Sequence, residues 1–181
     1  MHNMNARPRG AQQQPTPSLV TGGKALQAAL VAGRQSGHLK LRGRSLTALP
    51  AETCAIGTVA LPEGSAWWET RETLETLDAS QNEIELLPDE ISCLDQLREL
   101  DISRNKLTAL PPAECWAPLE SLVSLSIGHN RLSALPEGLG AHNLPPLVRL
   151  AANDNLLAHL PESLGGMQDL VVRPLRAVDG L

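Results

Sequence analysis

The 181-residue sequence contains no phenylalanine and no tyrosine, and it has only three tryptophans. Its core must therefore consist of aliphatic side chains, and 33 leucines supply most of them. Hydrophobic residues make up 42% of the chain and charged residues 19%, which is the balance of a globular protein rather than a disordered one. A core built so largely from one aliphatic side chain predicts a repeat protein.

Long apolar runs are also missing. No stretch approaches the roughly 18 consecutive apolar residues of a membrane-spanning helix. The first 23 residues lack the apolar run of a secretory signal. We therefore expect a soluble, cytoplasmic protein without membrane contact, with the nucleus as the alternative location.

Cysteine is scarce: Cys54, Cys93 and Cys115 are an odd number, and no two of them have the spacing of a metal-binding pair. This pattern argues against a disulfide framework and against a zinc cluster. We expect three unpaired thiols that pack in the interior.

Acidic residues are absent from the first 51 positions, which carry seven Lys and Arg residues, whereas the remainder carries 8 such cations against 20 acids. Only Arg7 and Arg9 lie in the Gln- and Pro-rich opening, too few for a polybasic patch, so residues 1–23 are predicted to form a disordered basic tail. Whether this tail is a targeting signal stays open. Nucleic acid is not an expected partner, because the rest of the chain is acidic and lacks aromatic residues for base stacking.

A repeat emerges when the leucines are aligned on the template LxxLxLxxNxLxxLP. Four segments share its register, and their starts lie 23, 25 and 25 residues apart, inside the window of about 20 to 29 residues for leucine-rich repeats. The segments begin at Leu74, Leu97, Leu122 and Leu147, and their ninth position is Asn82, Asn105, Asn130 and Asn155.

Alternation of period two within each segment predicts a short strand with leucines pointing inward. Successive strands must be parallel, because a return segment on the opposite side separates them. The predicted fold is an α/β solenoid, a right-handed superhelix with a short parallel sheet on its concave face and an irregular or 3-10 convex side. The ninth-position asparagines are expected to form a structural ladder that satisfies backbone groups at each turn.

The ends of the stack need covers. Residues 24–50 are predicted to form an N-terminal capping helix and a degenerate first repeat, in which Arg44 stands where the asparagine should be. Residues 51–73 form an insertion containing Trp67 and Trp68, and residues 74–163 form four repeats. Residues 164–181 form a degenerate repeat or an improvised cap, and whether the chain is full length or a shortened form of a longer repeat protein stays open.

Family resemblance rests on the segment from Arg34 to Pro50, on the WWE at Trp67 and on the 23-residue repeat. These features resemble the leucine-rich-repeat-containing protein 40 group of intracellular proteins. The repeats alone are also similar to the Ras-group-related leucine-rich-repeat proteins of plants and to Ras-pathway scaffolds. The resemblance implies a non-enzymatic scaffold, with signalling as its expected setting, although those relatives carry many more repeats.

Outward positions of the strands are the candidate partner-binding residues. They are Glu75 and Arg98 at the second position, Asp78 and Asp101 at the fifth, and Arg104 and His129 at the eighth, together with Trp68 in the insertion. Trp68 either faces outward as a binding hot spot or packs with Trp67 over the edge of the first repeats.

Asp78 and Asp101 would place like charges about 4.8 Å apart on neighbouring strands. If the first two strands pair across the insertion, Lys40 is expected to neutralise Asp78. Otherwise the pair favours a basic partner group or, weakly, a divalent ion.

Catalysis is not expected. Arg104, His129 and Asp154 share one row, but no nucleophile or oxyanion hole accompanies them, and no metal or cofactor motif occurs. We expect a monomer that binds another protein, the alternative being a fragment with only a structural role.

Overall fold

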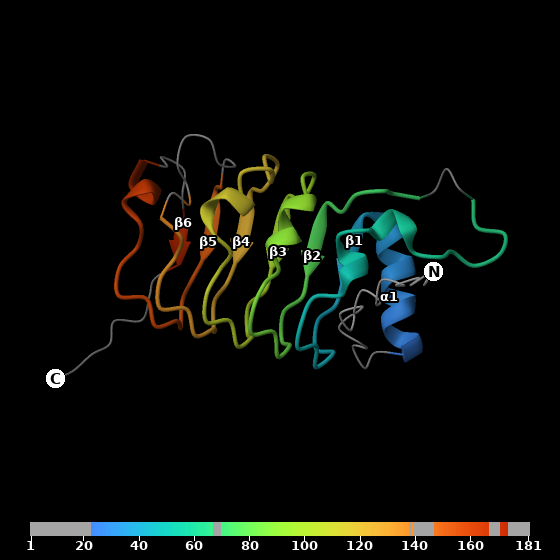
Figure 1. The fold of residues 1–181 in the computed structure, drawn as a ribbon, viewed down its shortest axis with the longest axis horizontal. Coiled ribbons are helices and arrows are strands. Elements are labelled where there is room, and N and C mark those ends of the chain that lie inside the picture. Colours follow the sequence, from blue (N-terminus) through green and yellow to red (C-terminus); the bar gives the residue numbers. More distant parts are fainter. Residues whose placement is uncertain (1–22, 67–69, 138, 140–146, 167–170, 174–181) are drawn as a thin grey trace, which may run out of the picture.

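A computed structural model describes residues 23–66, 70–137, 139, 147–166 and 171–173. Six short strands form one parallel sheet in chain order (Figure 1). They are β1 (His38–Lys40), β2 (Thr76–Asp78), β3 (Glu99–Asp101), β4 (Ser124–Ser126), β5 (Arg149–Ala151) and β6 (Val171–Arg173). The predicted parallel stack is therefore confirmed.

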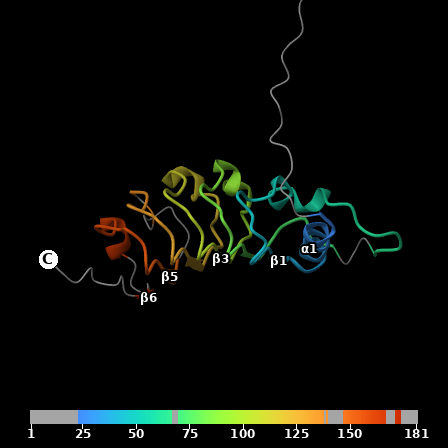
Figure 2. The same cartoon turned by 90° about the horizontal axis from the view of Figure 1, so that it is seen from below.

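The return segments carry 3-10 helices, and Figure 2 shows them on the side of the stack opposite the strands. They are η1 (Ala51–Thr53), η2 (Ile56–Thr58), η4 (Asp89–Cys93), η5 (Ala113–Cys115) and η6 (Glu162–Gly166). All except η2 start directly after a proline, because proline presets the backbone φ and gives up an N–H that the turn does not need. This confirms the expected 3-10 character of the return side.

Helix α1 (Gly23–Ser36) lies beside β1 at the N-terminal end of the stack (Figure 1). The two elements lie close together at Gly33, where an added Cβ would lie 3.0 Å from Leu39 Cδ1. Leu30 and Gly33 are buried in this contact. The helix thus covers apolar surface that the first strand would otherwise expose.

No helix in the described ranges is long and apolar enough to cross a membrane.

Strands β1 and β2 pair directly, although residues 41–75 separate them in sequence. Part of the intervening segment packs against the stack, where Ile56 and Val59 are buried. The Arg34 guanidinium, from α1, donates to the Val59 carbonyl. Trp67 and Trp68 lie outside the described residues, so the prediction for these two side chains stays untested.

The core is a column of aliphatic side chains. Leu77, Leu100, Leu125 and Leu150 are each 1% exposed and lie in register on successive strands. Burying one leucine contributes roughly 1.5–3 kcal/mol relative to leaving it in water.

Trp116 is the one buried aromatic side chain of the described part, and its Nε1–H donates to the Pro111 carbonyl at 3.0 Å, so its polar atom is satisfied.

Each template asparagine joins two neighbouring repeats. Asn105 Nδ2 donates to the Ala79 carbonyl of the preceding repeat and to the Ile102 carbonyl of its own, both at 3.0 Å. Its Oδ1 accepts the Ile84 N–H at 3.1 Å. The same arrangement recurs at Asn82, Asn130 and Asn155. One short amide thus pairs backbone groups that leave the sheet and would otherwise be buried unpaired.

Immediately before each asparagine the backbone is left-handed. Gln81, Arg104, His129 and Asp154 have φ between 54° and 57°, and Gly43 occupies the same place in the first repeat. This conformation directs the amide toward the following repeat: Gln81 N–H donates to the Ser103 carbonyl at 3.0 Å, and Arg104 N–H to the Gly128 carbonyl at 2.8 Å. The turns therefore extend the strand ladder by one further hydrogen bond per repeat.

The expectation for the cysteines was wrong in two of three positions. Cys54 and Cys93 form a disulfide with a Cα–Cα distance of 5.8 Å. It joins the segment after η1 to the end of η4. Cys54 is half-buried and Cys93 exposed. Neither cysteine therefore packs as a core thiol. Cys115 is free, and partial burial and then the negative charge of Asp89 raise the pKa of its thiol. A protonated thiol is a poor nucleophile for disulfide exchange.

We predict that the disulfide stabilises the folded chain substantially. It closes a loop with a sequence separation of 39 residues, for which chain entropy alone gives about 4 kcal/mol. A Cys54→Ser, Cys93→Ser double variant should lose roughly 2–4 kcal/mol of unfolding free energy in urea denaturation without reductant, and wild type with reductant should match it.

Cys115→Ser is the matched control, because it removes a thiol that forms no disulfide. Its unfolding midpoint should remain as sensitive to reductant as that of the wild type. A wild-type midpoint that does not move on reduction would show that the link adds nothing to stability.

Candidate functional site

The outward side chains of the strands form one surface, here called the sheet face. It consists of two rows. The third-position row is His38, Thr76, Glu99, Ser124 and Arg149, and the fifth-position row is Lys40, Asp78, Asp101, Ser126 and Ala151. Of these two rows, only the fifth-position row was predicted from the sequence. The third-position row follows from the same alternation, because both neighbours of an inward leucine point outward.

Asp78 and Asp101 have a structural role as well as an outward position. Asp78 Oδ1 accepts the Ser80 N–H at 3.0 Å and the Ser80 hydroxyl at 2.6 Å, and Asp101 Oδ1 accepts the Ser103 N–H at 2.9 Å. These bonds close the turn as the chain leaves the sheet. Each carboxylate therefore uses one oxygen for its own turn and keeps its charge on the surface.

Lys40 lies alongside Asp78 in the strand register, as pairing across the insertion requires. The two side chains do not form an ion pair: among the described residues, no carboxylate lies within 4.0 Å of the Lys40 ammonium. The proposed neutralisation of Asp78 by direct contact with Lys40 is therefore not seen.

Glu75 and Arg98 lie at the edge of the sheet face where the strands begin. Both line a shallow hollow of about 280 Å³ together with Glu99 and Arg149. Glu75 Oε1 also lies 3.6 Å from Arg71 Nη1. Both side chains are exposed, so this ion pair contributes little to stability. The structure thus brings Glu75 and Arg98 together, as neighbouring strands require.

Arg104 and His129 lie at the opposite edge, in the left-handed turns. His129 Nε2 is 3.4 Å from Arg104 Nη2, and its Nδ1 is 3.3 Å from Asp154 Oδ2. The Asp154 carboxylate also accepts from Asn153 Nδ2 at 2.7 Å. The row considered for catalysis is therefore a contiguous polar chain on an exposed edge.

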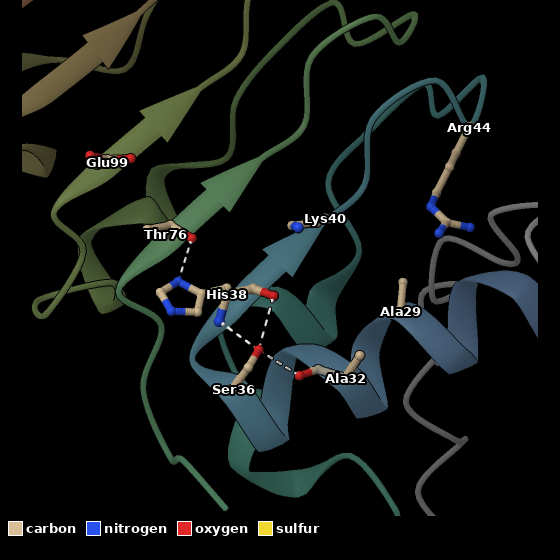
Figure 3. Close-up of a pocket in the computed structure, with 8 residues that line it drawn as sticks. All are labelled: Ala29, Ala32, Ser36, His38, Lys40, Arg44, Thr76 and Glu99. Carbon is tan, nitrogen blue, oxygen red and sulfur yellow. Dashed lines mark hydrogen bonds between the residues drawn. The ribbon is translucent and has the colours of Figure 1, made fainter.

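A larger hollow opens where α1 meets the sheet face (Figure 3). It measures about 690 Å³ and is lined by Ala29, Ala32, Ser36, His38, Lys40, Arg44, Thr76 and Glu99. His38 Nδ1 lies 2.9 Å from the Thr76 hydroxyl. The helix supplies the small apolar wall of this hollow, and the first strands supply its polar floor.

Arg44 occupies the asparagine position of the first repeat, which α1 precedes in the described part of the chain. Its backbone N–H donates to Asn82 Oδ1 at 2.9 Å, and its Nη1 donates to the Ala25 carbonyl of α1 at 3.0 Å. The arginine side chain is long enough to reach the helix, whereas an asparagine at this position would be too short. Its Nε is buried and has no partner among the described residues.

The described residues contain no group of three or more His, Cys, Asp or Glu side chains that could hold a metal ion. Asp78 and Asp101 alone supply too few oxygens for calcium. What the sheet face offers is exposed charge in fixed rows, which is suited to binding another macromolecule through ion pairs and hydrogen bonds.

Comparison with known proteins agrees with this geometry. The family model described as Leucine Rich Repeat matches residues 73–94 and 96–117. The architecture is a leucine-rich-repeat solenoid. Among solved structures, the chain is similar to YopM from Yersinia enterocolitica WA-314, with 28% identity and a TM-score of 0.54 over 80% of this chain and 27% of that one.

It is also similar to a Shigella effector leucine-rich-repeat domain, with 25% identity and a TM-score of 0.54, over 85% of this chain and 57% of that one. The solenoid thus spans well under two thirds of the length of either neighbour. These likenesses concern the repeat architecture, and the side chains of the sheet face must be interpreted from this chain itself.

We predict that the turn role of Asp78 can be separated from its charge. Asp78→Ala should cost about 1–3 kcal/mol of unfolding free energy, because it leaves the buried Ser80 N–H and hydroxyl without their acceptor. Asp78→Asn keeps an oxygen in place and should lose less than half as much in urea denaturation. Equal losses in the two variants would contradict a hydrogen-bonding role for this side chain.

Proposed function

We propose that this solenoid is a non-enzymatic scaffold that binds another protein through its sheet face. One observation supports the proposal above others: charged side chains of both signs stand in register on a sheet whose turns are fixed by side-chain hydrogen bonds. Such a surface presents charge to a partner without the entropic cost of ordering a loop.

The proposed contact residues are those predicted from the sequence, Glu75, Asp78, Arg98, Asp101, Arg104, His129 and Trp68, with the third-position row added. Because no described aromatic side chain stands on this face, the contact depends on electrostatic complementarity, and its strength falls with salt. We propose the cytoplasm or nucleus as the location and signalling as the setting, and the only support for both is the resemblance to intracellular scaffolds noted in the sequence.

Co-purification from cells tests this function with the full chain as bait. The test variant is Asp78→Asn with Asp101→Asn, which removes two charges while keeping the acceptors of both turns. The matched control is Glu114→Gln with Glu162→Gln, which removes two exposed charges from η5 and η6 on the return side.

We expect a specific protein to be recovered by wild type and by the control, and its recovery by the test variant to fall severalfold. Recovery should also fall between about 50 and 300 mM salt, because ions screen exposed charges at these concentrations. Equal recovery by both variants would show that the binding surface lies elsewhere, and the absence of any specific protein would leave a purely structural role.

A further inference from the structure

The charges of the sheet face follow an order along the stack. Strand β1 contributes the cation Lys40, β2 and β3 contribute the acids Asp78, Glu99 and Asp101, and β5 contributes the cation Arg149. The two outward residues of β4 are serines. Positive charge therefore lies at both ends of this surface, with negative charge between them.

None of these five side chains has its charge neutralised within the described part of the chain. The ion pairs found there join Arg71 to Glu75, Lys106 to Glu83, and His129 to Asp154, and none of them includes any of these five side chains. The turns occupy one oxygen of Asp78 and one of Asp101 but leave both carboxylates charged. The order of charges is therefore presented to solvent.

The cation at β1 lies in the hollow beneath α1. Lys40 and Arg44 both line it, and Figure 3 shows Lys40 on β1, with Ala29 and Ala32 on the neighbouring helix. The small side chains of Ala29 and Ala32 leave room for an incoming side chain. A carboxylate suits this hollow, because both charged side chains that line it on this side are cations, which attract a negative group.

We propose that the sheet face binds a segment of a protein partner that crosses the strands and presents an acidic, then a basic, then an acidic side chain, each about 10 Å from the next. The first acid enters the hollow at Lys40, the basic side chain meets the carboxylates of β2 and β3, and the second acid meets Arg149. This inference rests on the proposed function and specifies the chemistry of its partner.

The spacing of the charged strands also favours one backbone conformation for the partner segment. Strands lie about 4.8 Å apart, so β1 to β3 and β3 to β5 each span about 9.6 Å. A polyproline II segment has three residues per turn and rises about 3.1 Å per residue, so every third side chain faces the same side at intervals of about 9.3 Å. In a fully extended strand, side chains three apart point to opposite faces. The polyproline II segment therefore matches the surface without needing a free sheet edge.

Three synthetic peptides with blocked ends test the charge order. Peptide EPPKPPE has the proposed order, KPPEPPE has the same composition and net charge in a different order, and SPPSPPS is uncharged. Binding to the full chain is followed by NMR chemical shifts of its backbone amides at low salt. We expect EPPKPPE to bind at least about fivefold more tightly than KPPEPPE, with shifts on β1 to β5.

A charge exchange within the protein provides the decisive control. The double variant Lys40→Glu, Glu99→Lys keeps the net charge and alters only exposed side chains, so it should melt like wild type. It presents a negative charge at β1 and weakens the negative charge at β3. We therefore expect its preference to shift toward KPPEPPE.

Equal binding of the two charged peptides, or a preference unchanged in the double variant, would overturn the proposed charge order. Shifts confined to the return side would overturn it as well. These outcomes are separate from the co-purification result. Suppose that the Asp78, Asp101 variant loses the partner while the two charged peptides bind equally well. The scaffold function would then be supported, and the proposed chemistry of the partner segment would be refuted.

Discussion

The pairing of backbone groups where the chain leaves the sheet is the constraint on which this structure depends. Each strand has only three residues, so every repeat must soon turn away and would leave N–H and C=O groups buried without partners. The asparagine amide supplies both a donor and an acceptor at that place and reaches the neighbouring repeat as well. This one side chain therefore links each turn to the neighbouring repeat, beside the strands that carry the charges of the sheet face.

The left-handed residue before each asparagine has an energetic cost. A side chain in this conformation is disfavoured by about 1 kcal/mol, yet Gln81, Arg104 and His129 stand where glycine would be accommodated without strain. Their N–H groups donate hydrogen bonds to the next repeat, and these bonds offset part of the conformational cost. A glycine at the same position would make the same hydrogen bonds without that cost. The backbone geometry therefore does not explain why these positions carry side chains rather than glycine. The side chains are exposed and lie at the edge of the proposed binding surface.

Local periodicity explains why the stack could be predicted from the sequence. The spacing of Leu77 and Asn82 within one repeat defines the strand and its turn, and both recur in each of the four template repeats. The partner of Cys54 could not be predicted in this way, because its segment belongs to no repeat and has no register with Cys93 until it folds onto the return side. The contact of Arg44 with α1 likewise depends on the helix position, which the repeat pattern does not contain.

The candidate site was predicted only in part for a related reason. Period two identifies which side chains point outward, and it placed Asp78 and Asp101 correctly on adjacent strands. It gives no sign that their carboxylates also close the turns, since this depends on the backbone path two residues later. Nor does it show the hollow at Lys40, which exists only because α1 packs beside β1.

The most direct test of this account is the unfolding free energy of the Asn105→Leu variant, measured by urea denaturation against wild type and against Leu156→Ala at a site 70% exposed. Leucine is similar in size but removes the partners of the Ala79 and Ile102 carbonyls and of the Ile84 N–H. At about 1–3 kcal/mol per buried unpaired group, the loss should be at least about 3 kcal/mol, with little change for Leu156→Ala. A loss no larger than that of Leu156→Ala would show that the repeats are held together by leucine packing alone.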